Sequence, residues 1–135
     1  MLTKKKFAEQ NGLDLSKVFE LVLGQGGSIL PGRGFTGYMA EITESSLVCT
    51  NDKLGVKKEI PFSLFERAEF GIGNGLLWLQ CVVDGQSFIF SSPRKGWKSE
   101  AGKLLLERIG AHTEIIDMKE YTHYTGKLFF IYMWK

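Results

Sequence analysis

Two cysteines and two histidines are the residues of this sequence best suited to nucleophilic or metal chemistry. Cys49 and Cys81 lie inside apolar, strand-like segments, and His112 and His123 follow late in the chain. Zinc sites usually contain close pairs of ligands, and these four residues are widely spaced. The sequence therefore predicts no metal site, and no other pattern in it predicts a bound cofactor.

A nucleophilic centre would need Cys81 beside a base and an orienting acid, for which His112 and Glu114 are the candidates. An apolar setting raises the pKa of a thiol and lowers its reactivity. We therefore predict no catalytic residue and no enzyme, and a small thiol-dependent enzyme is the least favoured alternative. We interpret Cys49 and Cys81 as buried, reduced thiols of a cytoplasmic protein; a bridge between neighbouring strands is the alternative.

The segment 71–75 contains three glycines and looks like a phosphate-binding loop. A dinucleotide loop follows a strand and opens a helix, so that backbone N–H groups face the phosphates. Here the apolar segment 76–83 follows and has the character of a strand. The glycines therefore predict a hairpin connection.

Cations lie on one predicted hairpin and at the start of one predicted helix. The five that could contact an anionic surface are Lys57, Lys58, Arg94, Lys95 and Lys98. The alternative is that they form an ordinary solvated face. A net charge of +2 is too small to indicate a nucleic-acid partner, which would need a clustered basic face.

The last fifteen residues are unusually aromatic. Residues 127–134 predict a strand that is apolar on both faces, with Phe129, Phe130, Tyr132 and Trp134 as candidate interface residues. Such a strand needs cover on both sides, either from the N-terminal strand of its own chain or from a second copy. Deleting residues 127–135 should therefore cause aggregation, a large fall in melting temperature or loss of a dimer, measured by light scattering and thermal melts.

The elements that must position these residues are mostly short strands. The chain of 135 residues, with 44% apolar residues, ten Phe and three Trp, predicts one globular domain over residues 1–135. Residues 1–12 contain no apolar segment of the signal-peptide kind, and Lys4–Lys6 is expected to be a solvated terminus. The predicted strands are 13–23 (the least distinct), 38–42, 47–49, 56–60, 76–83 and 87–90.

Turn and helix signals divide these segments. Pro61 should end its strand or lie at a sheet edge, because it cannot donate a ladder hydrogen bond. Asp84-Gly85 predicts a two-residue hairpin turn. Ser92-Pro93 predicts the start of an amphipathic helix whose apolar stripe runs from Trp97 to Ile109, with Gly110 as its end. After it, 113–116 predicts a short strand and 120–126 a polar loop.

This order of elements resembles the pleckstrin-homology-like superfold, especially its bacterial and GRAM-like branches. The segments that carry the resemblance are 37–43, 46–49, the Ile60-Pro61 step leading to Leu64-Phe65, and the hairpin 82–90 before the helix. The resemblance implies a mainly β fold with one helix in the C-terminal half: an open barrel of antiparallel strands capped by that helix. The PH-like core would span about residues 37–110, with 111–135 as an additional tail containing a strand.

The same resemblance implies a binding or scaffolding module. Many relatives bind phosphoinositides through a basic first hairpin; the loop assigned to that place, 43–46, has no cation and one acid, which argues against headgroup binding there. The leading hypothesis is a non-enzymatic module that binds a protein partner and can form a homodimer. The runner-up is peripheral binding to anionic lipid.

Overall fold

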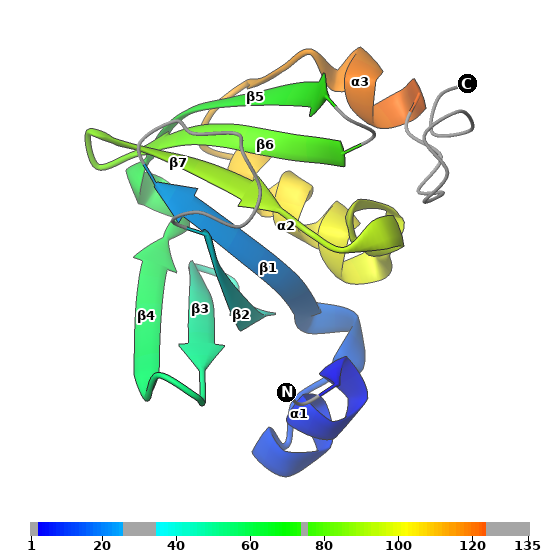
Figure 1. Cartoon of the computed structure of the whole chain (residues 1–135). Coiled ribbons are helices and arrows are strands. Elements are labelled where there is room, and N and C mark those ends of the chain that lie inside the picture. Colours follow the sequence, from blue (N-terminus) through cyan, green and yellow to red (C-terminus); the bar gives the residue numbers. More distant parts are fainter. Residues whose placement is uncertain (1–2, 26–34, 74–75, 124–135) are drawn as a thin grey trace.

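The computed structural model describes residues 3–25, 35–73 and 76–123, and side chains at Gln25, Phe35, Gly73, Leu76, Arg94, Lys95 and His123 are outside the description. Strands dominate the fold (Figure 1). The strands are β1 (Val18–Gln25), β2 (Phe35–Ile42), β3 (Ser46–Asn51), β4 (Val56–Pro61), β5 (Phe65–Gly73), β6 (Leu76–Val83), β7 (Gln86–Ser91) and β8 (Ile115–Ile116). The helices are α1 (Lys4–Asn11), α2 (Glu100–Gly110) and α3 (Met118–His123), with the 3₁₀ turns η1 (Leu15–Lys17), η2 (Phe62–Leu64) and η3 (Arg94–Lys98).

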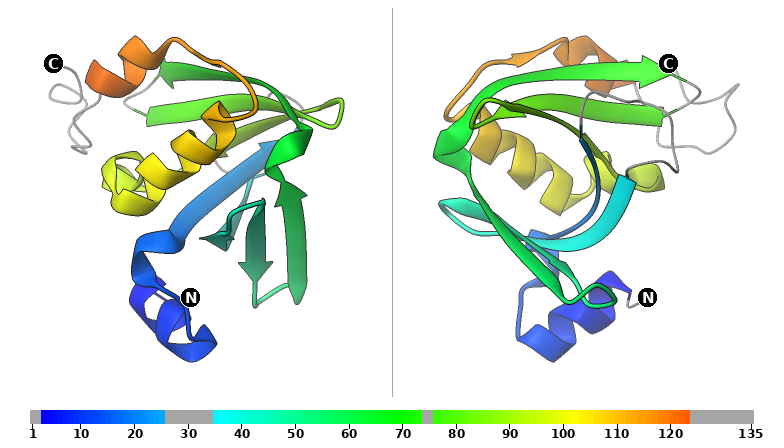
Figure 2. Two further views of the ribbon diagram at one scale, coloured as in Figure 1. Left: turned by 180° about the vertical axis from the view of Figure 1, so that it is seen from behind. Right: turned by 60° about the vertical axis from the view of Figure 1, so that its left-hand side comes forward.

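All the described strands join one sheet in the order β4-β3-β2-β1-β7-β6-β5-β8. Strands β1 to β7 pair antiparallel, and only β8 runs parallel to its neighbour β5. The sheet does not close, since β4 and β8 are its two ends. Figure 2 shows it bending strongly around α2. A mainly β fold with a bent antiparallel sheet and a helix after β7 is the arrangement implied by the pleckstrin-homology-like resemblance.

Alternation along the strands fills the concave face of the sheet with apolar side chains. Residues directly opposite each other in neighbouring strands share a face, so Phe19 of β1, Ala40 of β2 and Cys49 of β3 all point inward. From α2, Leu105 and Ile109 pack against this face and are fully buried. Burying a side chain of this size contributes roughly 1.5–3 kcal/mol, so the helix and the sheet stabilise each other.

The helix begins later than the sequence predicted. Ser99, not Ser92, is the N-cap of α2: its hydroxyl accepts the Gly102 N–H at 3.1 Å. Pro93 has an extended backbone and leads instead into η3, which contains Trp97. This break is possible because Gly102 lets α2 lie close to η3; an added Cβ would stand 2.7 Å from the Trp97 carbonyl oxygen. The predicted end at Gly110 is confirmed.

The predicted turns of the second half of the sheet are confirmed. Asp84 and Gly85 have φ values of 50° and 79°, as a two-residue hairpin with both positions left-handed requires. Gly73 pairs with Leu76, so a hairpin joins β5 to β6 as predicted, but residues 71–73 belong to strand β5, which the sequence did not predict. Pro61 is the last residue of β4, and β4 is a sheet edge, so both parts of that prediction hold.

The N-terminal region differs from the prediction. Lys4–Asn11 is a helix that the sequence did not predict, begun by the Thr3 hydroxyl, which accepts the Lys6 N–H. Lys5 and Lys6 are exposed on it, as expected. Its buried Phe7 and Ala8 pack with Val18 and Met39 on the outer face of β1 and β2. The helix covers the apolar patch that Val18 and Met39 form on this face, which also carries Glu20 and Glu41. The first strand is therefore β1, which begins at Val18 rather than near residue 13.

The structure of the C-terminal region agrees only in part with the sequence prediction. β8 lies inside the predicted strand 113–116. The predicted polar loop over residues 120–126 is wrong in its described part, because α3 extends to His123 and packs the partly buried Tyr121 against the core. The predicted strand 127–134, with its candidate interface residues Phe129, Phe130, Tyr132 and Trp134, lies outside the described residues. Among the described helices, none is long and apolar enough to cross a membrane.

Candidate binding surfaces

The two thiols occupy the core and not a reactive site. Cys49 on β3 and Cys81 on β6 are unpaired and fully buried. Burial raises the pKa of Cys49 to about 12, against a smaller opposing effect of Lys58, and burial also raises the pKa of Cys81. Both thiols are therefore protonated near neutral pH, which leaves little of the thiolate that a nucleophile requires.

The candidate partners of these thiols are not gathered around them. His112 and Glu114 are exposed after α2, and the hydrogen bond found at Cys81 goes to the Leu79 carbonyl at 3.9 Å. Within residues 3–25, 35–73 and 76–123, no group of three or more His, Cys, Asp or Glu side chains could hold a metal ion. The described part of the chain thus brings together neither the predicted thiol, histidine and acid nor a metal-binding cluster.

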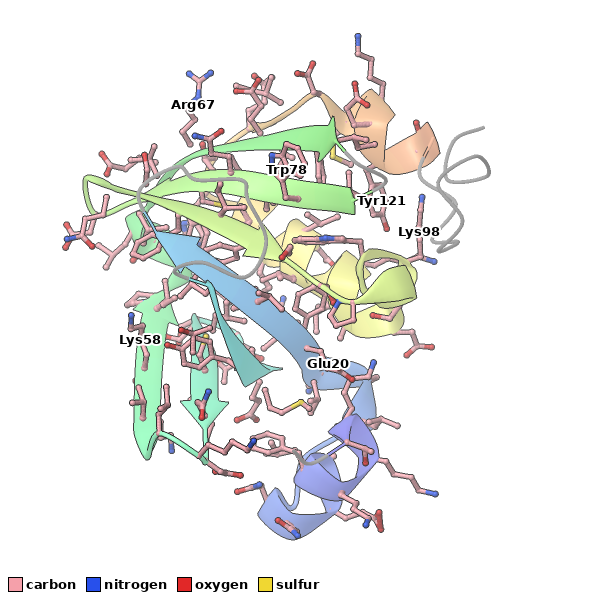
Figure 3. All side chains as sticks on the ribbon, in the orientation of Figure 1. Glu20, Lys58, Arg67, Trp78, Lys98 and Tyr121 are labelled. Atoms are coloured by element: carbon pink, nitrogen blue, oxygen red, sulfur yellow. The ribbon has the colours of Figure 1, made fainter. Side chains whose placement is uncertain are left out.

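The predicted cations are divided between two distant places. Lys57 and Lys58 lie on β4, whereas Arg94, Lys95 and Lys98 lie along η3. Figure 3 shows Lys58 and Lys98 on opposite sides of the molecule. Lys57 and Lys58 also face opposite sides of the sheet, since Lys57 pairs with Thr50 and Lys58 pairs with the inward-facing Cys49. The structure therefore does not bring Lys58 and Lys98 together.

The hairpin that was assigned to headgroup binding is a different one from the first hairpin of the fold. Because β1 precedes β2, the first hairpin spans the connection from Gln25 to Phe35, and residues 43–46 join β2 to β3. The absence of a cation at residues 43–46 therefore has no bearing on the first hairpin. Residues 26–34 lie outside the described residues.

Lys98 is engaged within its own chain. Its Nζ donates a hydrogen bond to the Tyr121 carbonyl at 2.6 Å and lies 4.0 Å from the centre of the Tyr121 ring. Partial burial, and secondarily the positive charge of Lys103, lowers the pKa of Lys98. These contacts bind α3 to η3, as the labelled side chains in Figure 3 illustrate.

The β5 edge of the sheet is covered by the chain that follows α2. The Thr113 hydroxyl donates to the Glu66 carbonyl at 3.2 Å, and β8 then pairs with Ala68 and Glu69. Further along, the Tyr121 ring stacks on Phe70, with 5.5 Å between ring centres. Strand β8 thus occupies the middle of this edge, and α3 packs beside it on the inner face of β5.

An aromatic cluster anchors that cover. Trp97 packs edge-on to Phe70 and against Phe19, and its Nε1 donates to the Leu77 carbonyl at 3.1 Å. The Tyr121 hydroxyl donates to the Trp97 carbonyl at 2.9 Å, and burial raises the pKa of that phenol. The covering segment is thus joined to the core of the concave face by a hydrogen bond and by ring stacking.

The β4 edge has no such cover among the described residues. In Figure 1 this strand forms the margin of the sheet, with no described element beyond it. The Phe62 N–H donates to the Ser45 carbonyl at 2.9 Å, which continues the β3–β4 ladder. Hydrogen-bonded pairs alternate along an antiparallel ladder, so Lys58 and Ile60 also bond to β3. The backbone N–H and C=O groups of Lys57 and Glu59 therefore point away from the sheet.

Side chains at this edge are accessible as well. Every residue of β4 from Val56 to Glu59 is exposed, and only Ile60 is buried. At the tip of the β3–β4 hairpin, Leu54 is 63% exposed and Val56 is 37% exposed. Charged side chains on an open edge normally discourage unspecific pairing, so a specific partner here must match them.

The comparisons with known proteins add a fold likeness. No family model and no curated protein matches the sequence. Among solved structures, the chain is similar to the N-terminal PH domain of human ARAP2, with 17% identity, a TM-score of 0.48, and 71% of this chain and 82% of that one covered. It is also similar to inner membrane complex sub-compartment protein 3 from Toxoplasma gondii, with 11% identity, a TM-score of 0.49, and coverage of 83% and 89%. Likenesses this distant do not transfer a function.

Sequence reasoning missed Glu59 as a surface residue of interest and missed Tyr121 as an anchor. The edge itself was predicted from Pro61, and the charged residues before that proline agree with an edge strand. The role of Tyr121 had no local signal, because its contacts with Phe70 and Trp97 join segments far apart in the sequence.

Proposed function

We propose that this protein is a non-enzymatic interaction module that binds a protein partner by strand addition at the β4 edge. The observation that carries the proposal is the contrast between the two margins of the sheet: β5 is covered by β8 and α3, whereas Lys57 and Glu59 of β4 turn their backbone groups outward. An extended peptide can pair with such groups, which supply affinity while the neighbouring side chains supply specificity.

Two residues with outward backbone groups define the length of the binding edge. Pro61 has no N–H to offer at one end, and at the other end Gly55 turns the chain with a φ of +63°. A partner would therefore pair over about three to five residues. A short contact of this kind suits a reversible interaction rather than a permanent one.

Proline substitution tests the proposal without disturbing the fold. In Glu59→Pro the lost N–H is one that points away from β3, so the internal ladder stays intact. Glu59→Ala is the matched control, since it removes the carboxylate but keeps the N–H. Random linear peptides selected against the immobilised protein should bind the Ala variant and lose about tenfold or more in affinity for the Pro variant. Equal binding to both variants would overturn strand addition at β4.

Anionic lipid remains the alternative function, supported by the exposure of Lys57 and Lys58 on the same strand. Flotation with vesicles of phosphatidylcholine and phosphatidylserine at low and moderate salt separates the two functions. Binding that depends on salt and is lost in Lys57→Glu plus Lys58→Glu would favour lipid. Absence of flotation at both salt concentrations would remove that alternative.

A further inference from the structure

The β4 edge is complementary to itself. Its three central residues read Lys57-Lys58-Glu59, and the two outward-facing members carry opposite charges. Two copies of such a strand can pair antiparallel about a twofold axis. The residue numbers of any two facing residues then add up to the same total, which is set by the residue on the axis. We infer that a second copy of this chain is a partner of the β4 edge, with Lys58 on the twofold axis. This inference rests on the proposed function and names one partner for it.

The backbone geometry selects this register. With Lys58 on the axis, Lys57 of each copy faces Glu59 of the other, and both residues have outward N–H and C=O groups. The two copies then exchange four backbone hydrogen bonds, two at each Lys57–Glu59 pair. Shifting the register by two residues in one direction puts the Lys57 residues of both copies opposite each other. Shifting it in the other direction puts the two Glu59 residues together and sets Lys57 against Pro61, which has no N–H.

The side chains agree with the same register. Lys57 lies opposite Thr50 and Glu59 lies opposite Val48 within the sheet, so both side chains are on its outer face. In the dimer each lysine would lie directly across from a glutamate on that face, and opposite charges in this position stabilise a strand pair. Two such ion pairs would form, one on either side of the axis.

Lys58 opposes the dimer and provides a specific test. On the axis the two Lys58 side chains would be directly opposite on the inner face, in a pair without backbone hydrogen bonds between them, where side chains are closest. Its Nζ lies 6.0 Å from the Phe88 ring of its own chain. The contact is small and carries this repulsion, so we expect a weak dimer, with a dissociation constant on the order of 100 μM.

Charge exchange at the two outward positions tests the inference on the full chain. Sedimentation equilibrium over a concentration series measures the dimer. Lys57→Glu and Glu59→Lys should each raise its dissociation constant about fivefold or more, because each change places like charges opposite each other at both Lys57–Glu59 pairs of the dimer. The double variant Lys57→Glu plus Glu59→Lys should restore the dimer, since the pairs re-form with their signs reversed. Lys58→Thr should strengthen it, and Glu59→Pro should abolish it. Thermal melts of each variant verify folding.

Three results would overturn the inference. The first is a monomer at every concentration up to about 1 mM, tenfold above the expected constant. The second is a dimer that is unaffected by Glu59→Pro, which would place the interface elsewhere, including residues 127–134. The third is a double variant as weak as the single ones. In each case peptide binding that still depends on the Glu59 N–H would leave the proposed function standing, so the two failures are distinguishable.

Discussion

The two margins of the sheet differ in whether a later segment of the chain covers them. At β5 the chain returns after α2, adds β8 and docks α3, so that Tyr121 stacks on Phe70 and reaches the Trp97 carbonyl. At β4 no described segment returns, and the strand is exposed from Val56 to Glu59. The covered margin is aromatic and joined to the core, whereas the open margin is charged. This contrast is the basis of the proposed division of the sheet, with stability at the β5 margin and binding at the β4 margin.

The largest expected effect is at the covered margin. Trp97→Ala should lower the free energy of unfolding by about 3–5 kcal/mol, because it empties a fully buried site between Phe19 and Phe70 and removes the hydrogen bond to Leu77. Denaturant unfolding measures the change. Leu54→Ala at the exposed hairpin tip is the control, with an expected change within about 0.5 kcal/mol. Similar losses for the two variants would mean that the margins do not differ in stability.

The next effect depends on pH and on the two thiols, one beneath each margin. Cys49 faces Lys58 of β4, and Cys81 faces Ala68 of β5. Because the pKa of Cys49 is raised from 9.0 to about 12, its contribution to stability is complete below pH 9 and is lost as the pH rises toward 12. Relative to Cys49→Ala, the wild type should lose about 1.4 kcal/mol of unfolding free energy for each pH unit in that window.

Cys81→Ala should reveal the same trend, since burial raises the pKa of that thiol as well. Parallel pH profiles for the wild type and both alanine variants would contradict the assignment of the thiols to the core. Other groups titrate in this range too, so the comparison rests on differences between profiles. Denaturant unfolding at fixed pH steps provides them.

Local patterns predicted the antiparallel part of the fold well. The Asp84-Gly85 turn needed only two residues, and the apolar run 76–83 has the length and content of a buried strand. The same local reading failed at Ser92, because a hydroxyl followed by proline is a general helix start and only the close packing of Gly102 on η3 moves the start to Ser99. Helix α1 was missed because its apolar residues find their partners on β1 and β2.

The site was less predictable than the fold for a related reason. The sequence identified Lys57 and Lys58 as neighbours on a predicted strand, and strand alternation already places them on opposite faces. The register with β3 shows that Lys58 is the one on the inner face. Likewise, nothing near Lys98 in the sequence indicates that its ammonium group lies over the Tyr121 ring. Pro61 indicated a possible sheet edge at this strand. Whether another segment covers that edge depends on residues far away in the sequence, and the strand's own residues do not show it.

A smaller effect isolates one contact of the covered margin. Tyr121→Phe keeps the ring on Phe70 and removes only the hydrogen bond to the Trp97 carbonyl. We expect a loss of about 0.5–1.5 kcal/mol of unfolding free energy. Thermal and denaturant melts measure it, and Tyr121→Ala should lose more because the stacked ring goes as well. A Phe variant as damaging as the Ala variant would show that the hydroxyl, rather than the ring, holds α3 in place.

The smallest effect is a difference in local opening between the two margins. Both thiols are fully buried, so alkylation in the native state requires the structure to open. Cys49 lies on β3, with only the exposed strand β4 between it and the margin, whereas Cys81 lies on β6 behind β5, β8 and the docked α3. Opening near β4 breaks one ladder, and opening near β5 also breaks the contacts of Tyr121.

Alkylation followed by peptide mass analysis should therefore modify Cys49 several times faster than Cys81, at a rate for both far below that of the denatured chain. Tyr121→Ala should narrow the difference by raising the rate at Cys81 and leaving the rate at Cys49 nearly unchanged, because Tyr121 contacts β5 and η3 and not β4. Equal rates at the two thiols in the wild type would show that both margins open together, and the division between a stabilising margin and a binding margin would then be wrong. Fast modification of either thiol in the fully native protein would instead point back to reactive thiol chemistry.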